Sequence, residues 1–253
     1  MRVMILGAGR GTRLSPLSDK TPKPMLPIID KPILELIIER LKINGFHDIV
    51  INTSHLSKKI ENYFGNGSEF GVNISYSFEG KKKSGMRFPK AVGSAGGMKK
   101  IQNEKKFFEE PFLVICGDAI IDADLNSAMQ EHISSKAIAS ILVKDVNKSE
   151  VYKYGVVEVD KESNITSFQE KPKVEEAKSN TVNTGIYFFS PKILSEIPNN
   201  IDFDIGGDLF PKIVAKGLSI KAIKQEFQWI DIGTLEDYYS ANLMYVRGEI
   251  NLS

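Results

Sequence analysis

The 253-residue sequence predicts an α/β protein with a mostly parallel central sheet and helices on both faces. In the first half, short β-branched or apolar runs alternate with amphipathic segments of helical period, and this order is typical of such a sheet. The composition, with 42% hydrophobic and 26% charged residues, is that of one globular domain with a large core. Sheets of this kind bind ligands beyond the carboxyl ends of their strands, so a site is expected there.

Each element follows from its local pattern. The expected strands of the first half are residues 3–6, 48–53, 73–78, 112–116 and 137–143, and the expected helices are 32–44, 57–64, 95–102 and 124–134. The second half is strand-rich, with expected strands 155–159, 165–169 and 183–189, followed by helices 208–216 and 235–247. This half is therefore expected to add a smaller, strand-rich part to the sheet.

Residues 80–97 form the one loop of unusual composition, because they hold Lys81–Lys83, Pro89 and a cluster of glycines. The composition indicates a mobile and functional loop. Its three consecutive lysines either screen phosphates or lie in solvent.

The charge balance and the cysteine count limit the partners and the compartment. With 33 Lys and Arg against 32 Asp and Glu, the net charge is +1, so neither nucleic acid nor a membrane surface is expected as a partner. The single cysteine, Cys116, excludes an internal disulfide framework and fits a reducing compartment. No apolar run approaches the ~18 residues of a membrane span, so a cytoplasmic location is expected. His47, His55 and His132 lack metal-ligand spacing and are expected to be surface or structural residues.

A glycine-rich loop, GAGRGTRL at residues 7–14, follows the first expected strand. Its glycines do not have the G-x-G-x-x-G spacing of a dinucleotide fingerprint, and the G-K-[ST] end of a P-loop is absent. Two interpretations remain. In one, backbone N–H groups, the Thr12 hydroxyl and Arg13 bind a polyphosphate. In the other, Gly7 and Gly9 only form a tight strand-to-helix turn.

The segment Thr21-Pro22-Lys23-Pro24 favours the phosphate-binding interpretation. Prolines on both sides of Lys23 restrict its backbone to extended conformations, so a flexible side chain is mounted on a stiff support. A lysine that only contacts solvent does not need such a support. Lys23 is therefore expected to belong to the site.

These two motifs, G-A-G-R-G-T-R-L and P-K-P-M-L-P, resemble the signature of the sugar-phosphate nucleotidylyltransferases, also called nucleotide-sugar pyrophosphorylases. The resemblance continues in order over nearly the whole chain, at residues 93–97 (GSAGG), 116–118 (CGD), 154–157 (YGVV), 168–172 (FQEKP), 183–187 (NTGIY) and 229–233 (WIDIG). Counting the first two as one signature, seven motifs in the right order are not expected by chance. The resemblance implies a Rossmann-like central sheet with a small strand-rich sugar-binding part, the nucleotide-diphospho-sugar transferase fold.

The resemblance implies transfer of a nucleotidyl group from an NTP to a sugar 1-phosphate, with Mg²⁺ as cofactor and pyrophosphate as second product. Such a reaction needs positioning and charge neutralisation rather than a protein nucleophile. By resemblance, Arg13 holds the triphosphate and Lys23 neutralises the α-phosphate. The other nucleotide-binding residues that the resemblance implies are Leu6, Gly7, Ala8, Gly9, Gly11, Thr12, Gly93, Ser94, Gly96 and Gly117.

Asp118 and Asp231 each follow an apolar stretch. An aspartate in this position often caps a helix or forms a turn. The resemblance implies instead that the pair binds Mg²⁺, which prefers one or two carboxylates together with phosphate oxygens and water. With Arg13 and Lys23, the two aspartates form the expected catalytic set.

The resemblance also implies a sugar-phosphate side, in which Glu170 accepts hydrogen bonds from sugar hydroxyls and Lys171 faces the sugar phosphate. Neighbouring side chains of a strand point to opposite faces, so both reach one ligand only if the strand ends there. Pro172 predicts such an end and restricts Lys171 to extended geometry. The full set of sugar-phosphate residues is Gly155, Glu170, Lys171, Asn183, Thr184 and Gly185.

The base loop GSAGG and the motif WIDIG resemble mannose-1-phosphate guanylyltransferases, so GTP and mannose 1-phosphate are the expected substrates. UTP or dTTP with glucose 1-phosphate is the alternative. A Rossmann dehydrogenase is disfavoured by the glycine spacing, and a non-catalytic nucleotide-sugar sensor by the retained Lys23, Asp118 and Asp231. Residues 1–253 are expected to form a single catalytic domain without a hexapeptide-repeat domain, and a homo-oligomer is left open.

Overall fold

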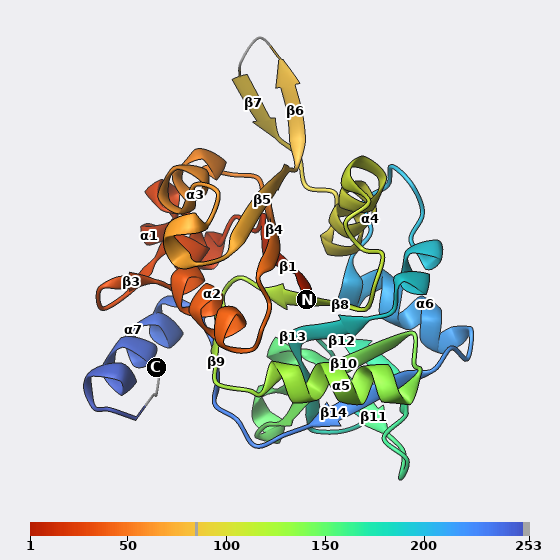
Figure 1. Cartoon of the computed structure of the whole chain (residues 1–253). Helices are drawn as coiled ribbons and strands as arrows, with labels where there is room; N and C mark the ends of the chain where they lie inside the picture. The colour runs from red at the N-terminus through yellow and green to blue at the C-terminus, as the bar shows by residue number, and fades with distance from the viewer. Residues whose placement is uncertain (84–85, 250–253) are drawn as a thin grey trace.

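The computed structural model describes residues 1–83 and 86–249, which form a mixed α/β fold around one large sheet (Figure 1). The strands of this sheet are β1 (Arg2–Gly7), β4 (Asp48–Thr53), β5 (Asn73–Phe78), β8 (Phe112–Cys116), β10 (Ala139–Asp145), β11 (Gly155–Val159), β12 (Ile165–Glu170), β13 (Thr181–Phe189) and β14 (Ile220–Lys224). Three small pairs lie outside it: β2 (Pro27–Ile28) with β3 (Lys31–Pro32), β6 (Gly80–Lys83) with β7 (Met86–Pro89), and β9 (Ala119–Ile121) with β15 (Trp229–Asp231). The predicted α/β fold with a mostly parallel central sheet is confirmed.

The parallel part of the sheet has the order β8-β1-β4-β5. Its strands are buried on both faces, and the side chains of β1 alternate between them, with Ile5 in one core and Met4 in the other. Leu6 lies opposite Cys116 in the register, so the loops that follow β1 and β8 emerge side by side. This edge carries the glycine-rich loop and Asp118.

The strand-rich half joins the parallel part through β13. This strand is antiparallel to both β8 and β10, and β11 and β12 continue the sheet beyond it as another antiparallel pair. The chain then returns to the sheet as β14, which is parallel to β10. The smaller part is thus continuous with the main sheet.

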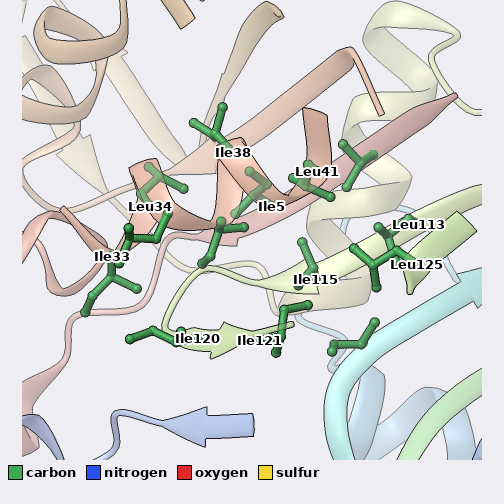
Figure 2. Close-up of a cluster of buried hydrophobic side chains, with 14 of the residues drawn as sticks. Ile5, Ile33, Leu34, Ile38, Leu41, Leu113, Ile115, Ile120, Ile121 and Leu125 are labelled. Atoms are coloured by element: carbon green, nitrogen blue, oxygen red, sulfur yellow. The ribbon is translucent and has the colours of Figure 1, made fainter. Parts of the chain in front are cut away.

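Helices cover both faces of the sheet. The helices are α1 (Leu17–Lys20), α2 (Ile33–Ile43), α3 (Ser57–Phe64), α4 (Ser94–Lys105), α5 (Leu125–Ser135), α6 (Phe210–Ala215) and α7 (Leu235–Val246). Residues of α2, α3 and α5 share one core with Ile5, whereas α4 and α6 share the other with Met4. Figure 2 shows the centre of the first core, where Leu34 and Ile38 of α2 lie near Ile115 of β8. None of the described helices is long and apolar enough to cross a membrane.

The predicted elements are best confirmed where the pattern is strongest. The expected strands 48–53, 73–78, 112–116 and 155–159 and the helix 57–64 have the predicted boundaries. The strand expected at 137–143 lies two residues further along, because pairing with β13 extends β10 to Asp145. β9, β14 and β15 were not predicted, since they are short and show no alternation of apolar and polar residues.

Part of the segment predicted as a loop, residues 80–97, is a β-hairpin. β6 pairs antiparallel with β7, with Lys81 opposite Phe88, and the hairpin projects from the body of the molecule (Figure 1). Gly80 has a φ of 147°, and a Cβ there would collide with the Phe88 carbonyl oxygen. Lys81 and Lys83 are exposed, as the solvent alternative expects, and residues 84–85 lie outside the described part of the chain. Backbone pairing therefore gives the lysine-rich β6 a strand conformation that its own sequence does not predict.

His132 is a buried structural residue of α5. It is 2% exposed, and its Nδ1 lies 2.8 Å from Ser140 Oγ on β10. Burial lowers the pKa of His132 to about 4. The folded protein therefore holds this imidazole neutral near neutral pH.

We predict that His132 makes the stability of the protein depend on pH. The unfolded chain binds a proton at this residue below pH ~6.5, whereas the folded chain does not until about pH 4. The free energy of unfolding is therefore unaffected by this residue above pH ~6.5, and it falls by up to about 3 kcal/mol as the pH is lowered toward 4. Urea unfolding of the wild type and of His132→Gln at pH 7 and pH 5 would test this, and the variant should lose less stability between them. Equal losses would contradict the assignment.

Candidate active site

A pocket of about 240 Å³ opens at the carboxyl ends of β1 and β8, on the predicted edge of the sheet. The predicted site residues that line it are Leu6, Arg13, Ser94, Asp118, Gly155, Glu170, Lys171, Asn183, Thr184, Gly185 and Asp231. Other predicted nucleotide residues are not among the described residues of the lining, namely Gly7, Ala8, Gly9, Gly11, Thr12, Gly93, Gly96 and Gly117. The fold thus brings both halves of the predicted site to one pocket.

Lys23 reaches the pocket through an ion pair with Asp118. Its Nζ lies 2.6 Å from Asp118 Oδ2, and its side chain is only 10% exposed. The predicted extended backbone at Lys23 is wrong, because this residue begins a 3-10 turn in which the Met25 N–H donates to the Pro22 carbonyl at 2.7 Å. The fixed φ of Pro24 fits such a turn. The prolines therefore stiffen the support of Lys23 in a helical form.

Asp231 arrives beside Asp118 through a strand pair. β15 is antiparallel to β9, which places Asp231 opposite Ala119, and the Ile232 N–H donates to the Asp118 carbonyl at 3.2 Å. Directly after this pair, Thr234 and Asp237 form a capping box that begins α7. The backbone on both sides of Asp231 is therefore held by hydrogen bonds.

The charges of the four predicted catalytic residues act on one another. Burial, together with the negative charge of Asp118, raises the pKa of Asp231 to about 6, and the positive charges of Lys23 and Arg13 oppose this shift. A Cβ added to Gly233 would lie 3.5 Å from Asp231 Oδ2 and 3.7 Å from Arg13 Nη1, so the guanidinium lies near this carboxylate. The predicted catalytic set is thus gathered in one place.

The donor set of this place fits Mg²⁺. Within residues 1–83 and 86–249, no three His, Cys, Asp or Glu side chains are grouped so that they could hold a metal ion. Two carboxylates beside an open pocket suit an ion that takes its remaining ligands from phosphate oxygens and water, and they do not suit structural zinc. A cation would also relieve the repulsion between Asp118 and Asp231. Mg²⁺ binding stays a prediction, and Asp118 and Asp231 are suitable ligands for it.

Glycine is required at different positions of the first loop for different structural reasons. The Gly7 N–H donates to Asn52 Oδ1 at 2.8 Å, and a Cβ on Gly7 would lie 2.9 Å from the Asn52 carbonyl oxygen. Gly11 has a φ of 63° and would place a Cβ 2.9 Å from Lys23 Cβ. A Cβ on Gly9 would meet no described atom within 4 Å. Packing in a tight turn therefore explains Gly7 but not Gly9, which has the open backbone that close approach of an anion requires. Gly11, which the tight-turn interpretation did not name, is also required by its backbone and its packing.

Glycines of the other motifs are required by packing inside the protein. Gly185 has a φ of 79°, and its Cβ would lie 2.6 Å from Cys116 Sγ. A Cβ on Gly155 would lie 2.7 Å from Phe168 Cζ, and one on Gly117 would lie 2.8 Å from the Leu6 carbonyl oxygen. Packing inside the protein therefore explains these three glycines without reference to a ligand.

The strand β12 ends at Glu170, as predicted, but the geometry of the end differs. Lys171 has a φ of 45°, so the prediction of an extended backbone is wrong. Its N–H donates to the Tyr154 carbonyl at 3.1 Å, and this left-handed kink lets Lys171 Nζ approach Glu170 Oε1 to 3.7 Å. Burial raises the pKa of Glu170, and the charge of Lys171 opposes the shift. Two adjacent side chains thus face one pocket, as expected.

The base loop expected at residues 93–97 packs against a distant segment. The Gly96 N–H donates to the Phe203 carbonyl at 2.9 Å, and a Cβ on Gly93 would collide with the same carbonyl group. The Ser94 hydroxyl donates to Asp204 Oδ2 at 2.8 Å. The Gly96 N–H is therefore engaged within the protein and does not read a base edge in this conformation.

Some residues of the lining were not predicted to belong to the site. They are Cys116, Ala119, Lys153, Tyr154, Tyr187, Asp204, Ile205, Gly206 and Trp229. Several of them lie within or next to the matched motifs, so the motifs could have indicated them. Asp204, Ile205 and Gly206 lie outside every motif. The one sequence feature that could have indicated them is an aspartate shortly before an expected helix, which is typical of an N-cap. Burial raises the pKa of the Cys116 thiol well above its usual range, which agrees with a packing role.

Comparison with known proteins identifies the family. The sequence profile described as nucleotidyl transferase matches residues 2–248. The chain belongs to this family. The resemblance to sugar-phosphate nucleotidylyltransferases is confirmed by its relatives.

Two characterised relatives differ in the nucleotide that their names state. The UTP–glucose-1-phosphate uridylyltransferase of Synechocystis sp. is 50% identical over 251 residues, which are 99% of this chain and 64% of the relative. The mannose-1-phosphate guanylyltransferase of Mycobacterium tuberculosis is 29% identical over 246 residues, which are 97% of this chain and 64% of the relative. The chain therefore spans just under two thirds of the length of these relatives.

Solved structures share the fold over nearly the whole chain. A UDP-glucose pyrophosphorylase complexed with UDP-glucose has a TM-score of 0.80 and 25% identity, covering 98% of both chains. HddC from Yersinia pseudotuberculosis complexed with GMP-PN has a TM-score of 0.77 and 26% identity, covering 96% of this chain and 99% of that one. The nucleotide-diphospho-sugar transferase fold is thus confirmed.

We predict that Gly185 and Gly9 respond differently to the same small substitution. Gly185→Ala should lower the free energy of unfolding by about 2–3 kcal/mol, because it combines a positive φ with a collision against Cys116. Gly9→Ala, the matched control, should change it by less than about 0.5 kcal/mol. Urea unfolding of both variants measures the difference. Equal effects would show that packing does not require Gly185.

Proposed function

We propose that the chain transfers a uridylyl group from UTP to glucose 1-phosphate, forming UDP-glucose and releasing pyrophosphate. The observation that carries this proposal is the 50% identity, over 251 residues, to the UTP–glucose-1-phosphate uridylyltransferase of Synechocystis sp.. The expected pair, GTP and mannose 1-phosphate, has weaker support, since the guanylyltransferase of M. tuberculosis is 29% identical. The alternative that names UTP and glucose is therefore preferred.

The chemistry of the pocket supports this class of reaction. An oxygen of glucose 1-phosphate attacks the α-phosphorus of UTP, a new P–O bond forms, and the bond to the bridging oxygen of the β-phosphate breaks. Both reactants are anionic, so the protein must hold them together against their repulsion. Cationic side chains line the pocket, namely Arg13, Lys153 and Lys171. Such a pocket suits two phosphate-bearing ligands.

Lys23 and Arg13 take different parts in this proposal. Lys23 is buried and already held 2.6 Å from Asp118, so its ammonium is positioned before substrate binds. It would neutralise the α-phosphate as charge shifts in the transition state. Arg13 lies near Asp231 at the pocket wall and would hold the β- and γ-phosphates that leave as pyrophosphate.

Asp118 and Asp231 are the residues that would hold Mg²⁺. When bound, the ion offsets the negative charge of the triphosphate and of the leaving pyrophosphate. The protein's own task is to present both carboxylates ionised. With a pKa of about 6, Asp231 meets this condition at neutral and higher pH.

On the other side of the pocket, Glu170 would accept hydrogen bonds from sugar hydroxyls while Lys171 binds the sugar phosphate. The kink at Lys171 supports this division, because it turns both side chains toward one ligand. The partly buried carboxylate of Glu170 is an acceptor that a hydroxyl-bearing sugar would satisfy.

A sensor without catalysis is the rival class. Such a protein would bind a nucleotide sugar and would not need Lys23 aimed at Asp118. The ion pair between these two residues favours the enzyme.

We predict that pyrophosphate release is fastest with UTP and glucose 1-phosphate. The purified chain should be assayed with the four common NTPs, each against glucose, mannose and N-acetylglucosamine 1-phosphates. The preferred pair should exceed the others in kcat/KM by at least about tenfold, because unmatched buried polar groups penalise the wrong ligand.

EDTA should abolish turnover and added Mg²⁺ should restore it. Asp118→Asn and Asp231→Asn should each lower turnover by orders of magnitude.

Other results of this panel identify the rivals. A preference for GTP with mannose 1-phosphate would contradict the proposed substrates. Measurable binding of UDP-glucose without turnover of any pair would indicate a sensor.

We further predict that Lys23 and Arg13 differ kinetically. Lys23→Ala should mainly lower kcat, by about a hundredfold or more, because its charge acts in the transition state. Arg13→Ala should also raise the KM for the NTP, since it holds phosphates in the ground state as well. Steady-state kinetics with the NTP varied at saturating sugar 1-phosphate would measure both. The same pattern in the two variants would refute the division of roles.

A further inference from the structure

The wall between the expected base loop and the expected sugar side contains a reciprocal hydrogen-bonded bridge. Ser94 begins α4, and Asp204 precedes a single π-helical turn, Ile205–Leu209. The Ser94 hydroxyl donates to Asp204 Oδ2 at 2.8 Å, and the Ile205 N–H donates to Ser94 Oγ at 2.7 Å. These hydrogen bonds thus join the N-terminus of α4 to the N-terminus of the π-helical turn, two segments that are far apart in the sequence.

The other oxygen of the same carboxylate fixes the turn that follows. Asp204 Oδ1 accepts the Gly206 N–H at 2.8 Å and the Gly207 N–H at 3.0 Å. The Asp204 N–H in turn donates to Asp208 Oδ2 at 2.8 Å. A substitution of Asp204 therefore removes or alters hydrogen bonds both to the base loop and to this turn.

The turn lies directly against Glu170. A Cβ on Gly206 would lie 2.6 Å from Glu170 Oε2 and 3.3 Å from its Cδ, so the Glu170 carboxylate lies directly beside the Gly206 backbone. A second link runs through the backbone, because the Phe203 N–H donates to the Val92 carbonyl at 3.1 Å. The position of Glu170 thus depends on a turn that is tied to the base loop.

We propose that Asp204 is a positioning residue that couples the nucleotide side of the pocket to the sugar side. It acts through Ser94 on the base loop and through Gly206 on Glu170. The names of the two sides rest on the proposed function, and the bridge itself rests on the contacts above. A nucleotide that orders the base loop would then also order Glu170 and tighten the binding of the sugar phosphate.

Three substitutions separate this coupling from other effects. Asp204→Asn keeps an oxygen for the Gly206 and Gly207 N–H groups but removes the acceptor of the Ser94 hydroxyl. Ser94→Ala breaks the same bridge from the other end. Asp202→Asn is the matched control, because it removes one negative charge from the same segment and leaves the bridge in place.

Hydrogen exchange of the ligand-free protein tests the bridge without any need for activity. Ser94→Ala and Asp204→Asn should each raise amide exchange both at residues 93–97 and at residues 205–207, while Asp202→Asn should raise neither. Exchange that rises only in the segment carrying the substitution would overturn the proposal, since Asp204 would then be a local helix cap.

Steady-state kinetics test the consequence for the sugar side. With the substrate pair that the wild type prefers, both bridge variants should raise the KM for the sugar 1-phosphate by about tenfold, with a smaller change in kcat. The double variant should add little to either single one, because both break one bridge. A Ser94→Ala variant whose sugar KM is unchanged would overturn the coupling. A wild type without turnover would count against the proposed function alone, because the exchange experiment still decides the bridge.

Discussion

The parallel pairing of β1 with β8 is the constraint on which the site depends. Its register sets Leu6 opposite Cys116, and the ladder continues with the Gly117 N–H donating to the Leu6 carbonyl at 3.1 Å. Only glycine fits at position 117, because a Cβ would meet that carbonyl. The loop after each strand therefore starts from the same edge, and Lys23 can reach Asp118.

The charges at this edge are balanced mainly by one another. Lys23 and Asp118 form a largely buried pair, and the pKa of Asp231 is raised because its carboxylate is buried next to a second negative charge. A pair of carboxylates in this state is better satisfied by a cation than by another hydrogen bond. The site thus has a negative half, near the two aspartates, and cationic groups that suit phosphates.

Much of the fold could be predicted from the sequence, because burial on both faces gives parallel strands a continuous apolar signal. The predicted boundaries of β4 and β8 agree with the structure for this reason, whereas β5 was indicated by the alternation of polar and apolar residues in NISYSF. The pair of β9 and β15 could not be predicted, since it is three residues long and depends on contact between distant segments. The hairpin of β6 and β7 was missed because glycine, proline and three consecutive lysines are typical of a loop, and its pairing is in the backbone.

The candidate site, too, was predictable in part: its residues could be identified from the motifs, but their backbone conformations could not. The motifs indicated Arg13, Lys23, Asp118 and Asp231, and the fold gathers them in one place. Local conformation was less predictable: the backbone of Lys23 is helical and that of Lys171 is left-handed, although each precedes a proline. At Lys171 the hydrogen bond to the distant Tyr154 carbonyl outweighs the local preference of the chain, and at Lys23 the turn hydrogen bond from Met25 to Pro22 does so. Asp204 was not predicted because its local pattern indicates only a helix cap, and its link to Ser94 is a tertiary contact.

The late position of β15 has a consequence for the newly made chain. Domains fold during synthesis with their N-terminal part first, so β1, β4, β5 and β8 can pair while much of the sequence is still untranslated. Asp231 lies more than a hundred residues after Asp118, and it reaches the site only when β15 pairs with β9. A ribosome-bound chain therefore carries a half-built centre with one of its two carboxylates, and the second is supplied only after more than a hundred further residues have been translated.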